Sequence, residues 1–225
     1  MDFVSSHGVI KAGSYNTLVV RGIARCEDGV TFTTLVVHGT VVMRQCSGRG
    51  IRCDSGVVVC HGDMTVHEVR GDGELHVGGA LRCRRIDFTG VIRSRHGLIC
   101  MTTMAMRGMI HSTGMVNAER MHIQGPLIAD SVHARDIDIR PLHSALLTRH
   151  AKEYCETSRA RVMTGSHVVA RGLVCHSLVA TCADLQENCR IRRVTYRTRL
   201  TRDSTTTVDL ERRDDEAFAA HRRRA

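Results

Sequence analysis

Residues 86–90 read IDFTG, residues 104–108 read MAMRG and residues 121–125 read MHIQG. Each stretch alternates apolar residues with a variable residue and ends in glycine. Alternation with a period of two places both apolar side chains on one face of a β-strand and the residue between them on the other face. The three stretches therefore predict short strands that each end at a glycine corner.

The same unit recurs along much of the chain. Seven strand-like runs end in glycine, at Gly22, Gly39, Gly56, Gly73, Gly90, Gly108 and Gly125. Successive position numbers in this series differ by 17, except for one difference of 18. A second glycine follows six or seven residues later in most units, at Gly29, Gly62, Gly79, Gly97 and Gly114. Two glycines in a unit mark two corners at which the backbone turns sharply.

The length of the unit selects the fold. A unit of about 17 residues holds three short strands and their turns, but it is too short for a strand and a long helix. It cannot cover its own apolar face, so neighbouring units must stack on one another. We predict an all-β protein, a triangular parallel β-helix (β-solenoid) with rungs of about 17 residues. A β-sandwich also contains short strands, but it does not require a constant period.

The pattern divides the chain into five segments. The apolar alternation weakens after Ile139 and returns near Val168, and the residues between them allow either a helix or an irregular coil. The expected segments are 1–13 as an N-terminal segment, 14–140 as β-helix rungs, 141–165 as the interruption, 166–212 as C-terminal rungs and 213–225 as a charged tail.

Composition agrees with a layered aliphatic core. Of 225 residues, 42% are apolar and only seven are aromatic, which is too apolar for a disordered chain and suits repetitive packing. No window approaches 18 consecutive apolar residues, and the N-terminus lacks a signal-peptide pattern, so we expect a cytoplasmic protein with reduced cysteines. Buried cysteines commonly act as small hydrophobic side chains.

Longer stretches resemble a known family. The units LVVRG, LVVHG, IDFTG, MAMRG and MHIQG are followed by GPLIADSVHARDIDIR at 125–140 and ENCRIRRVTY at 187–196. Together they resemble the bactofilins, and more closely the longer bactofilin-like polymer-forming cytoskeletal proteins. The resemblance covers roughly residues 14–212. It implies a right-handed β-helix that polymerises end to end, without nucleotide, into filaments that serve as scaffolds in bacterial cells. The interruption, the scarcity of proline and the cysteine-rich stretch before Tyr196 depart from the family pattern.

Self-association also follows from the predicted fold. A solenoid ends in an open rung, whose backbone groups and apolar interior must be capped or paired with another copy. The candidate contact residues are Leu18 and Val20 at one end, and Tyr196, Leu200, Val208 and Leu210 at the other. The alternative is that the N-terminal segment and the C-terminal tail cap the two ends.

A second functional hypothesis rests on charge. The formal net charge is +9, and 30 of the 32 cationic residues are arginine. A dense set in the C-terminal part consists of Arg190, Arg192, Arg193, Arg197, Arg199 and Arg202. Such a surface fits a non-polymerising binding module that contacts an anionic partner, such as a membrane surface, another part of the cell envelope or nucleic acid. Nucleic acid is disfavoured, because seven aromatic residues offer little platform for base stacking.

Catalytic and metal-binding motifs are absent from the sequence. It has no GxSxG, HExxH, P-loop or dinucleotide fingerprint, and the period of its repeat differs from the tandem hexads of hexapeptide acyltransferases. No CxxC pair occurs. His133, His150 and His167 have the same spacing as the glycines, but the apolar pattern does not continue between them, so a histidine ladder is not expected. We therefore expect no enzymatic activity, small-molecule substrate, cofactor or metal.

Overall fold

The computed structural model describes residues 2–142 and 156–213, and these residues form β-strands and turns without a helix. The strands are β1 (Asp2–Ile10), β2 (Gly13–Cys26), β3 (Val30–Val37), β4 (Thr40–Met43), β5 (Cys46–Cys60), β6 (Met64–Val77), β7 (Ala80–Cys83), β8 (Arg85–Ser94), β9 (Gly97–Cys100), β10 (Thr103–Ser112), β11 (Met115–Asn117), β12 (Arg120–Gln124), β13 (Leu127–His133), β14 (Asp136–Arg140), β15 (Ser158–Arg171), β16 (Leu173–Gln186), β17 (Arg190–Arg202) and β18 (Thr207–Arg213).

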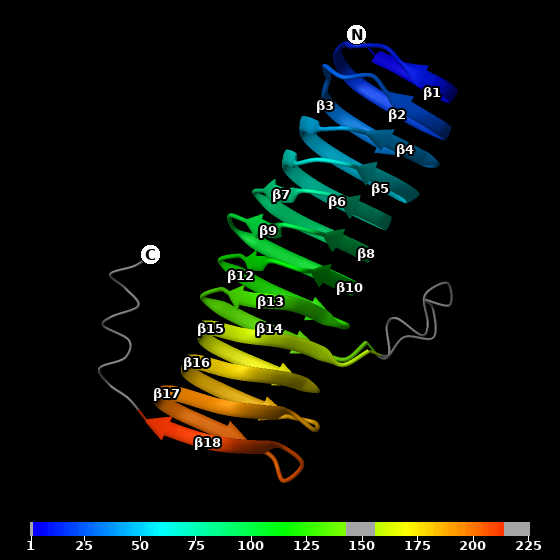
Figure 1. The fold of residues 1–225 in the computed structure, drawn as a ribbon. Coiled ribbons are helices and arrows are strands. Elements are labelled where there is room, and N and C mark those ends of the chain that lie inside the picture. Colours follow the sequence, from blue (N-terminus) through cyan, green and yellow to red (C-terminus); the bar gives the residue numbers. More distant parts are fainter. Residues whose placement is uncertain (1, 143–155, 214–225) are drawn as a thin grey trace.

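The strands wind into a parallel β-solenoid of about 12 turns (Figure 1). Each strand pairs in parallel with the equivalent strand of the next turn, for example β6 with β8 and β8 with β10. Rungs lie about 17 residues apart along the chain, as predicted. Hairpins, which would be antiparallel, do not occur among the described strands, so the β-sandwich alternative is wrong.

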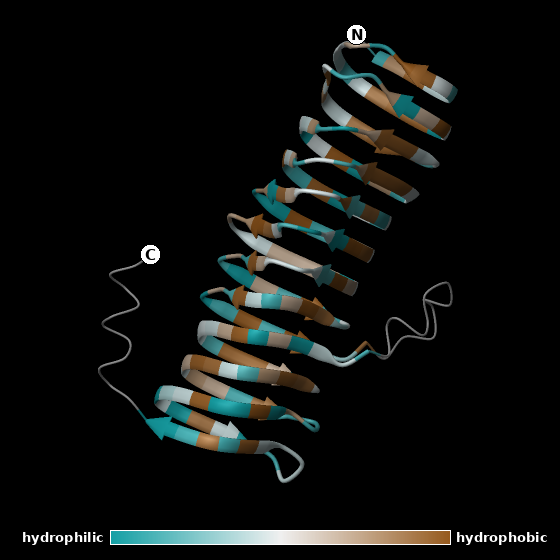
Figure 2. Ribbon diagram, viewed as in Figure 1, coloured by the Kyte–Doolittle hydropathy of each residue, from teal (hydrophilic) through white to brown (hydrophobic). Residues whose placement is uncertain are grey.

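Inward side chains of successive rungs form straight columns. Figure 2 shows apolar residues recurring at equivalent positions on successive rungs, with polar residues between them on many strands. One column begins at Leu18 and runs through Leu35, Ile51, Val69, Ile86, Met104, Met121, Ile137, Val168 and Ala183. All ten side chains are at most 2% exposed. Stacking of this kind buries an apolar face that no single rung could cover.

The periodic glycines stack at one corner. Gly73, Gly90, Gly108 and Gly125 all have φ between +123° and +136°, which L-residues with a side chain rarely adopt. A Cβ atom on Gly90 would lie 2.1 Å from the carbonyl oxygen of Gly73 on the preceding rung. Glycine is therefore required here both by the backbone angle and by the close approach of adjacent rungs.

The solenoid begins earlier than the sequence pattern indicated. β1 pairs with β2 from Asp2↔Thr17 to Ile10↔Cys26, so the first residues form a rung and not a separate segment over 1–13. The pattern hid this rung because two of its inward positions are Ser5, opposite Val20, and Gly8, opposite Ala24. A serine and a glycine interrupt the expected apolar alternation.

The interruption is also shorter than expected. β15 begins at Ser158, so residues 158–165 belong to the solenoid, and the helix considered for 141–165 falls mainly on residues 143–155, outside the described part. β13 and β15, which lie on either side of the interruption, pair directly with each other, for example Ile128 with Arg159. Before it leaves the described residues, the chain places Leu142 against Val91 and Met109, two outward side chains that are 0% and 3% exposed.

Paired residues of β13 and β15 lie further apart in the sequence than the usual 17 positions, and this longer spacing also separates the histidines. His133 lies opposite Thr164, and His167 lies opposite Asp136, where its Nδ1 is 3.1 Å from the Asp136 carboxylate. The two imidazoles therefore do not share a column, and His150 lies outside the described residues. Within the described ranges no group of three or more His, Cys, Asp or Glu side chains could hold a metal ion. None of the described residues forms a helix that could span a membrane.

Candidate functional site

The N-terminal end of the solenoid is an open β-edge. Within the described residues β1 pairs only with β2, so its other edge has no partner strand. Phe3 lies at an inward position above Leu18, and its ring centroid is 5.6 Å from that of Tyr15. Val4 and Val9 point outward and are 57% and 56% exposed. This end thus combines unpaired backbone groups with exposed apolar side chains.

Two predicted contact residues are not at this end. Leu18 and Val20 are 0% exposed, because Phe3 and Ser5 of β1 lie over them. Leu18 and Val20 are core residues, and their assignment to the contact surface was wrong. The terminal surface is instead formed by β1 itself, which the sequence pattern did not identify as a rung.

The C-terminal end is a second open edge. β18 pairs with β17 up to Tyr196↔Arg213, and the remaining part of β17, residues 197–202, has no further strand below it among the described residues. The predicted contact residues Tyr196, Leu200 and Val208 are partly buried and pack against the core, whereas Leu210 is 53% exposed. The tyrosine hydroxyl donates a hydrogen bond to Glu211, which raises the pKa of Tyr196.

Charged residues occupy inward positions on this last rung. Arg202 lies beneath Leu185, and Glu211 lies beneath Val194. Their side chains approach to 4.0 Å between Nη2 and Oε2. A pair of opposite charges therefore lies where the preceding rungs place apolar side chains, and the C-terminal end is more polar than the N-terminal end.

The loop between β17 and β18 is organised by Asp203. Its carboxylate accepts hydrogen bonds from the Glu187 backbone N–H at 2.8 Å and the Thr206 hydroxyl at 2.8 Å. Thr205 donates to it from both its backbone and its hydroxyl. These hydrogen bonds, that from Glu187 first, lower the pKa of Asp203 to about 2.

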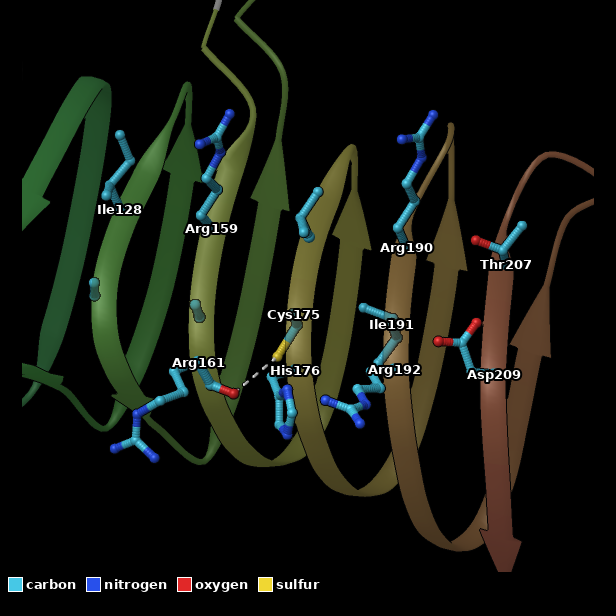
Figure 3. A pocket seen from close by; sticks show the side chains of 13 residues that line it. Ile128, Arg159, Arg161, Cys175, His176, Arg190, Ile191, Arg192, Thr207 and Asp209 are labelled. Atoms are coloured by element: carbon cyan, nitrogen blue, oxygen red, sulfur yellow. Dashed lines mark hydrogen bonds between the residues drawn. The ribbon is translucent and has the colours of Figure 1, made fainter.

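A groove runs across the outer surface of the C-terminal rungs (Figure 3). It is open to solvent and has a volume of about 580 Å³, and its floor includes Ala160 and Cys175. One bank is a column of directly opposed residues on successive strands, in the order Ile128, Arg159, Val174, Arg190 and Thr207. The other bank lies two residues further along each strand and consists of Asp130, Arg161, His176, Arg192 and Asp209. We call this feature the arginine groove.

The four arginines of the groove occur at two levels. Arg159 and Arg161 lie on β15, and Arg190 and Arg192 lie on β17, with Val174 and His176 of β16 between them. In Figure 3 the Arg159 and Arg190 side chains extend to one side of the floor, while Arg161 and Arg192 lie on the other side. Adjacent strands are about 4.8 Å apart, so the two arginine levels are separated by about 9.6 Å.

Only one of these arginines has an acidic partner among the described residues. Arg161 donates two hydrogen bonds to Asp130, from Nε at 2.7 Å and from Nη2 at 2.9 Å. This pairing raises the pKa of Arg161 and lowers that of Asp130. No ion pair within the described ranges engages Arg159, Arg190 or Arg192. Three fixed, solvent-facing positive charges therefore remain available around the floor.

The predicted arginine set is divided by the structure. Arg190 and Arg192 line the groove, whereas Arg193 lies beside Leu210 and Arg199 lies opposite Cys182. Arg197 accepts a hydrogen bond from Arg213 through its carbonyl oxygen, and Arg202 sits at the solenoid end. Arg159 and Arg161 were not among the predicted residues. Their alternation in SRARV at 158–162 marks outward positions on a strand, but the expected interruption concealed it.

Comparisons with known proteins found no match. Neither the family models, nor the curated proteins, nor the solved structures contain a match to this chain.

Proposed function

We propose that this protein is a non-enzymatic, bactofilin-like scaffold that self-associates without nucleotide through the ends of its solenoid. The observation that carries the proposal is the presence of an unpaired β-edge at each end, on β1 and on the β17–β18 rung. An exposed strand edge is a template for pairing with another chain. The proposal includes the resemblance to bactofilins. It also places the protein in the bacterial cytoplasm or at the cytoplasmic membrane.

The two edges differ in what they contribute to association. At the N-terminal end, pairing would remove Phe3 and its exposed neighbours from water, which favours association by the hydrophobic effect. The C-terminal rungs carry eight arginines against three acidic residues between 190 and 213. Contact between two C-terminal ends is therefore opposed by charge, and contacts that include β1 are favoured.

Sedimentation of the purified, reduced, nucleotide-free protein, with negative-stain images of the pellet, tests the proposal. We expect fibres or regular oligomers from the wild type. The double variant Val4→Lys/Val9→Lys should remain in the supernatant, because lysines on an edge strand oppose pairing. The matched control Met101→Lys/Met115→Lys adds the same charge at residues that are 70% and 38% exposed away from the ends, and it should assemble normally. A wild type that stays monomeric at all salt concentrations contradicts the proposal.

A second candidate function is supported by the arginine groove. Unpaired arginines around a common floor fit a binding module that contacts an anionic partner without polymerising. Retention on a polyanionic resin that falls as salt rises, shown by protein that sediments as a monomer, would favour this candidate over self-association.

A further inference from the structure

We propose that the arginine groove binds an acidic polysaccharide in which charged and uncharged sugar units alternate. The inference rests on the second candidate function and specifies its site and ligand. The chemical character of the residues along the groove changes at every rung.

Five rungs form the groove, and their character alternates. The rung of Arg190 and Arg192 presents two guanidinium groups that have no acidic partner among the described residues. The rung of Arg159 and Arg161 presents that of Arg159, because the Arg161 guanidinium is held by Asp130. Val174 with His176 separates them on the middle rung. The two outer rungs place Ile128 with Asp130 at one end and Thr207 with Asp209 at the other. Along the axis the groove therefore accepts anionic groups at the second and fourth levels only.

The distance between the accepting levels indicates the ligand's repeat. The second and fourth rungs are about 9.6 Å apart. A pyranose unit in an extended chain is about as long as one rung is high, so one sugar would lie at each level. Acidic groups on every second sugar would then meet Arg159 at one level and Arg190 with Arg192 at the other, and uncharged sugars would lie beside Ile128, Val174 and Thr207. Guanidinium groups donate paired hydrogen bonds that match the geometry of a carboxylate.

Polymers with a charge on every unit fit the groove less well. A third anion would lie against Val174, which is apolar and 38% exposed, and further anions would meet the Asp130 and Asp209 carboxylates. An acidic peptide is also disfavoured, because the strands that form the floor already use their backbone groups in parallel ladders. Single-stranded nucleic acid is disfavoured because no phenylalanine, tyrosine or tryptophan lines the groove to stack on successive bases.

Spacing and charge can be tested separately with labelled oligosaccharides. The probes are a hyaluronan octasaccharide, which has a carboxylate on every second sugar, and an oligogalacturonate of eight sugars, which has one on every sugar. Fluorescence anisotropy with full-length protein should give tighter binding of hyaluronan despite its lower charge. The double variant Arg159→Gln/Arg190→Gln should weaken hyaluronan binding at least tenfold.

The matched control is Arg52→Gln/Arg70→Gln. These two exposed arginines lie on adjacent rungs in another part of the surface, and each has an acidic partner, Asp54 or Glu68. The control should change the affinity less than twofold. Because Val174 sets the spacing, Val174→Arg should reverse the preference and make oligogalacturonate the tighter ligand. Circular dichroism verifies that each variant is folded.

Several outcomes would overturn the inference. It is wrong if hyaluronan does not bind, or if oligogalacturonate, an oligo(dT) strand or anionic phospholipid vesicles bind the wild type more tightly. It is also wrong if the Arg52→Gln/Arg70→Gln control loses as much affinity as the groove variant. If polyanions bind in a salt-sensitive way but the groove substitutions do not change their affinity, this site is refuted and the second candidate function still stands. Self-association is measured independently, by sedimentation without glycan.

Discussion

Gly90 turns a corner with φ of +123°, directly against the backbone of the previous rung. The Gly90→Ala variant should lower the free energy of unfolding by at least about 2 kcal/mol, because the backbone angle is strained for alanine and the Cβ would overlap the Gly73 carbonyl oxygen. Urea denaturation followed by circular dichroism measures the change.

Gly50 provides the matched control. A Cβ there would meet no atom closer than the Glu68 carbonyl oxygen at 4.0 Å. Gly50→Ala should therefore change stability by no more than about 0.5 kcal/mol. Equal effects of the two substitutions would show that the corner does not require glycine. The regular spacing of glycines was sufficient to predict these corners, because the requirement for glycine recurs on successive rungs from Gly73 to Gly125.

Among the elements, the loop between β17 and β18 depends on one carboxylate. Because the folded-state pKa of Asp203 is about 2, below the ordinary value of 3.8, its stabilising contribution is fully present above about pH 3.8 and is lost as the pH falls through 2. Hydrogen exchange of the Glu187 amide, which donates to Asp203, should accelerate in this window after correction for the intrinsic effect of pH.

The Asp203→Asn variant separates this effect from the titration of other acidic groups. It should already show fast exchange of the Glu187 amide at pH 5, with little further change down to pH 2. Unchanged protection in the wild type between pH 5 and pH 2 would contradict the role assigned to Asp203.

Element boundaries were predicted well in the middle of the chain and poorly at its ends. Strands such as β8, β10 and β12 have two strong apolar positions before a glycine, and their faces follow directly from alternation. β1 has Ser5 and Gly8 at inward positions, so the pattern could not identify it as a rung. Paired residues of β15 and β16, such as Ser158 and Leu173, are fewer positions apart in the sequence than the regular period of 17. A search for that period therefore does not find these two strands.

For the whole molecule, burial predicts which thiols react. Eight of the nine cysteines in the described ranges are buried, and Cys182 is half-buried. Burial raises the pKa of Cys53 to about 12 and the pKa values of Cys26 and Cys175 to about 11. The tenth cysteine, Cys155, lies outside the described residues and is replaced by serine for this experiment. In the Cys155→Ser variant, iodoacetamide at pH 8 should therefore modify Cys182 first, as read by peptide mass spectrometry.

The buried thiols should react only after the solenoid unfolds. Labelling in urea at the same pH supplies the control, since all nine should then be modified. Rapid modification of Cys53 or Cys26 under native conditions would mean that the stacked rungs open readily, contrary to a continuous core.

Sequence alone determined the repeat, the glycine corners and the inward face of most rungs, because these follow from local alternation and from a requirement for glycine that recurs on successive turns. Only the tertiary structure decided the two ends and the arginine groove. The groove forms only because Ile128 lies beside Arg159 across the interruption. This pairing is determined by which strand can cover the apolar face of β13. Such a pairing depends on packing between rungs, and no periodicity along the chain encodes it.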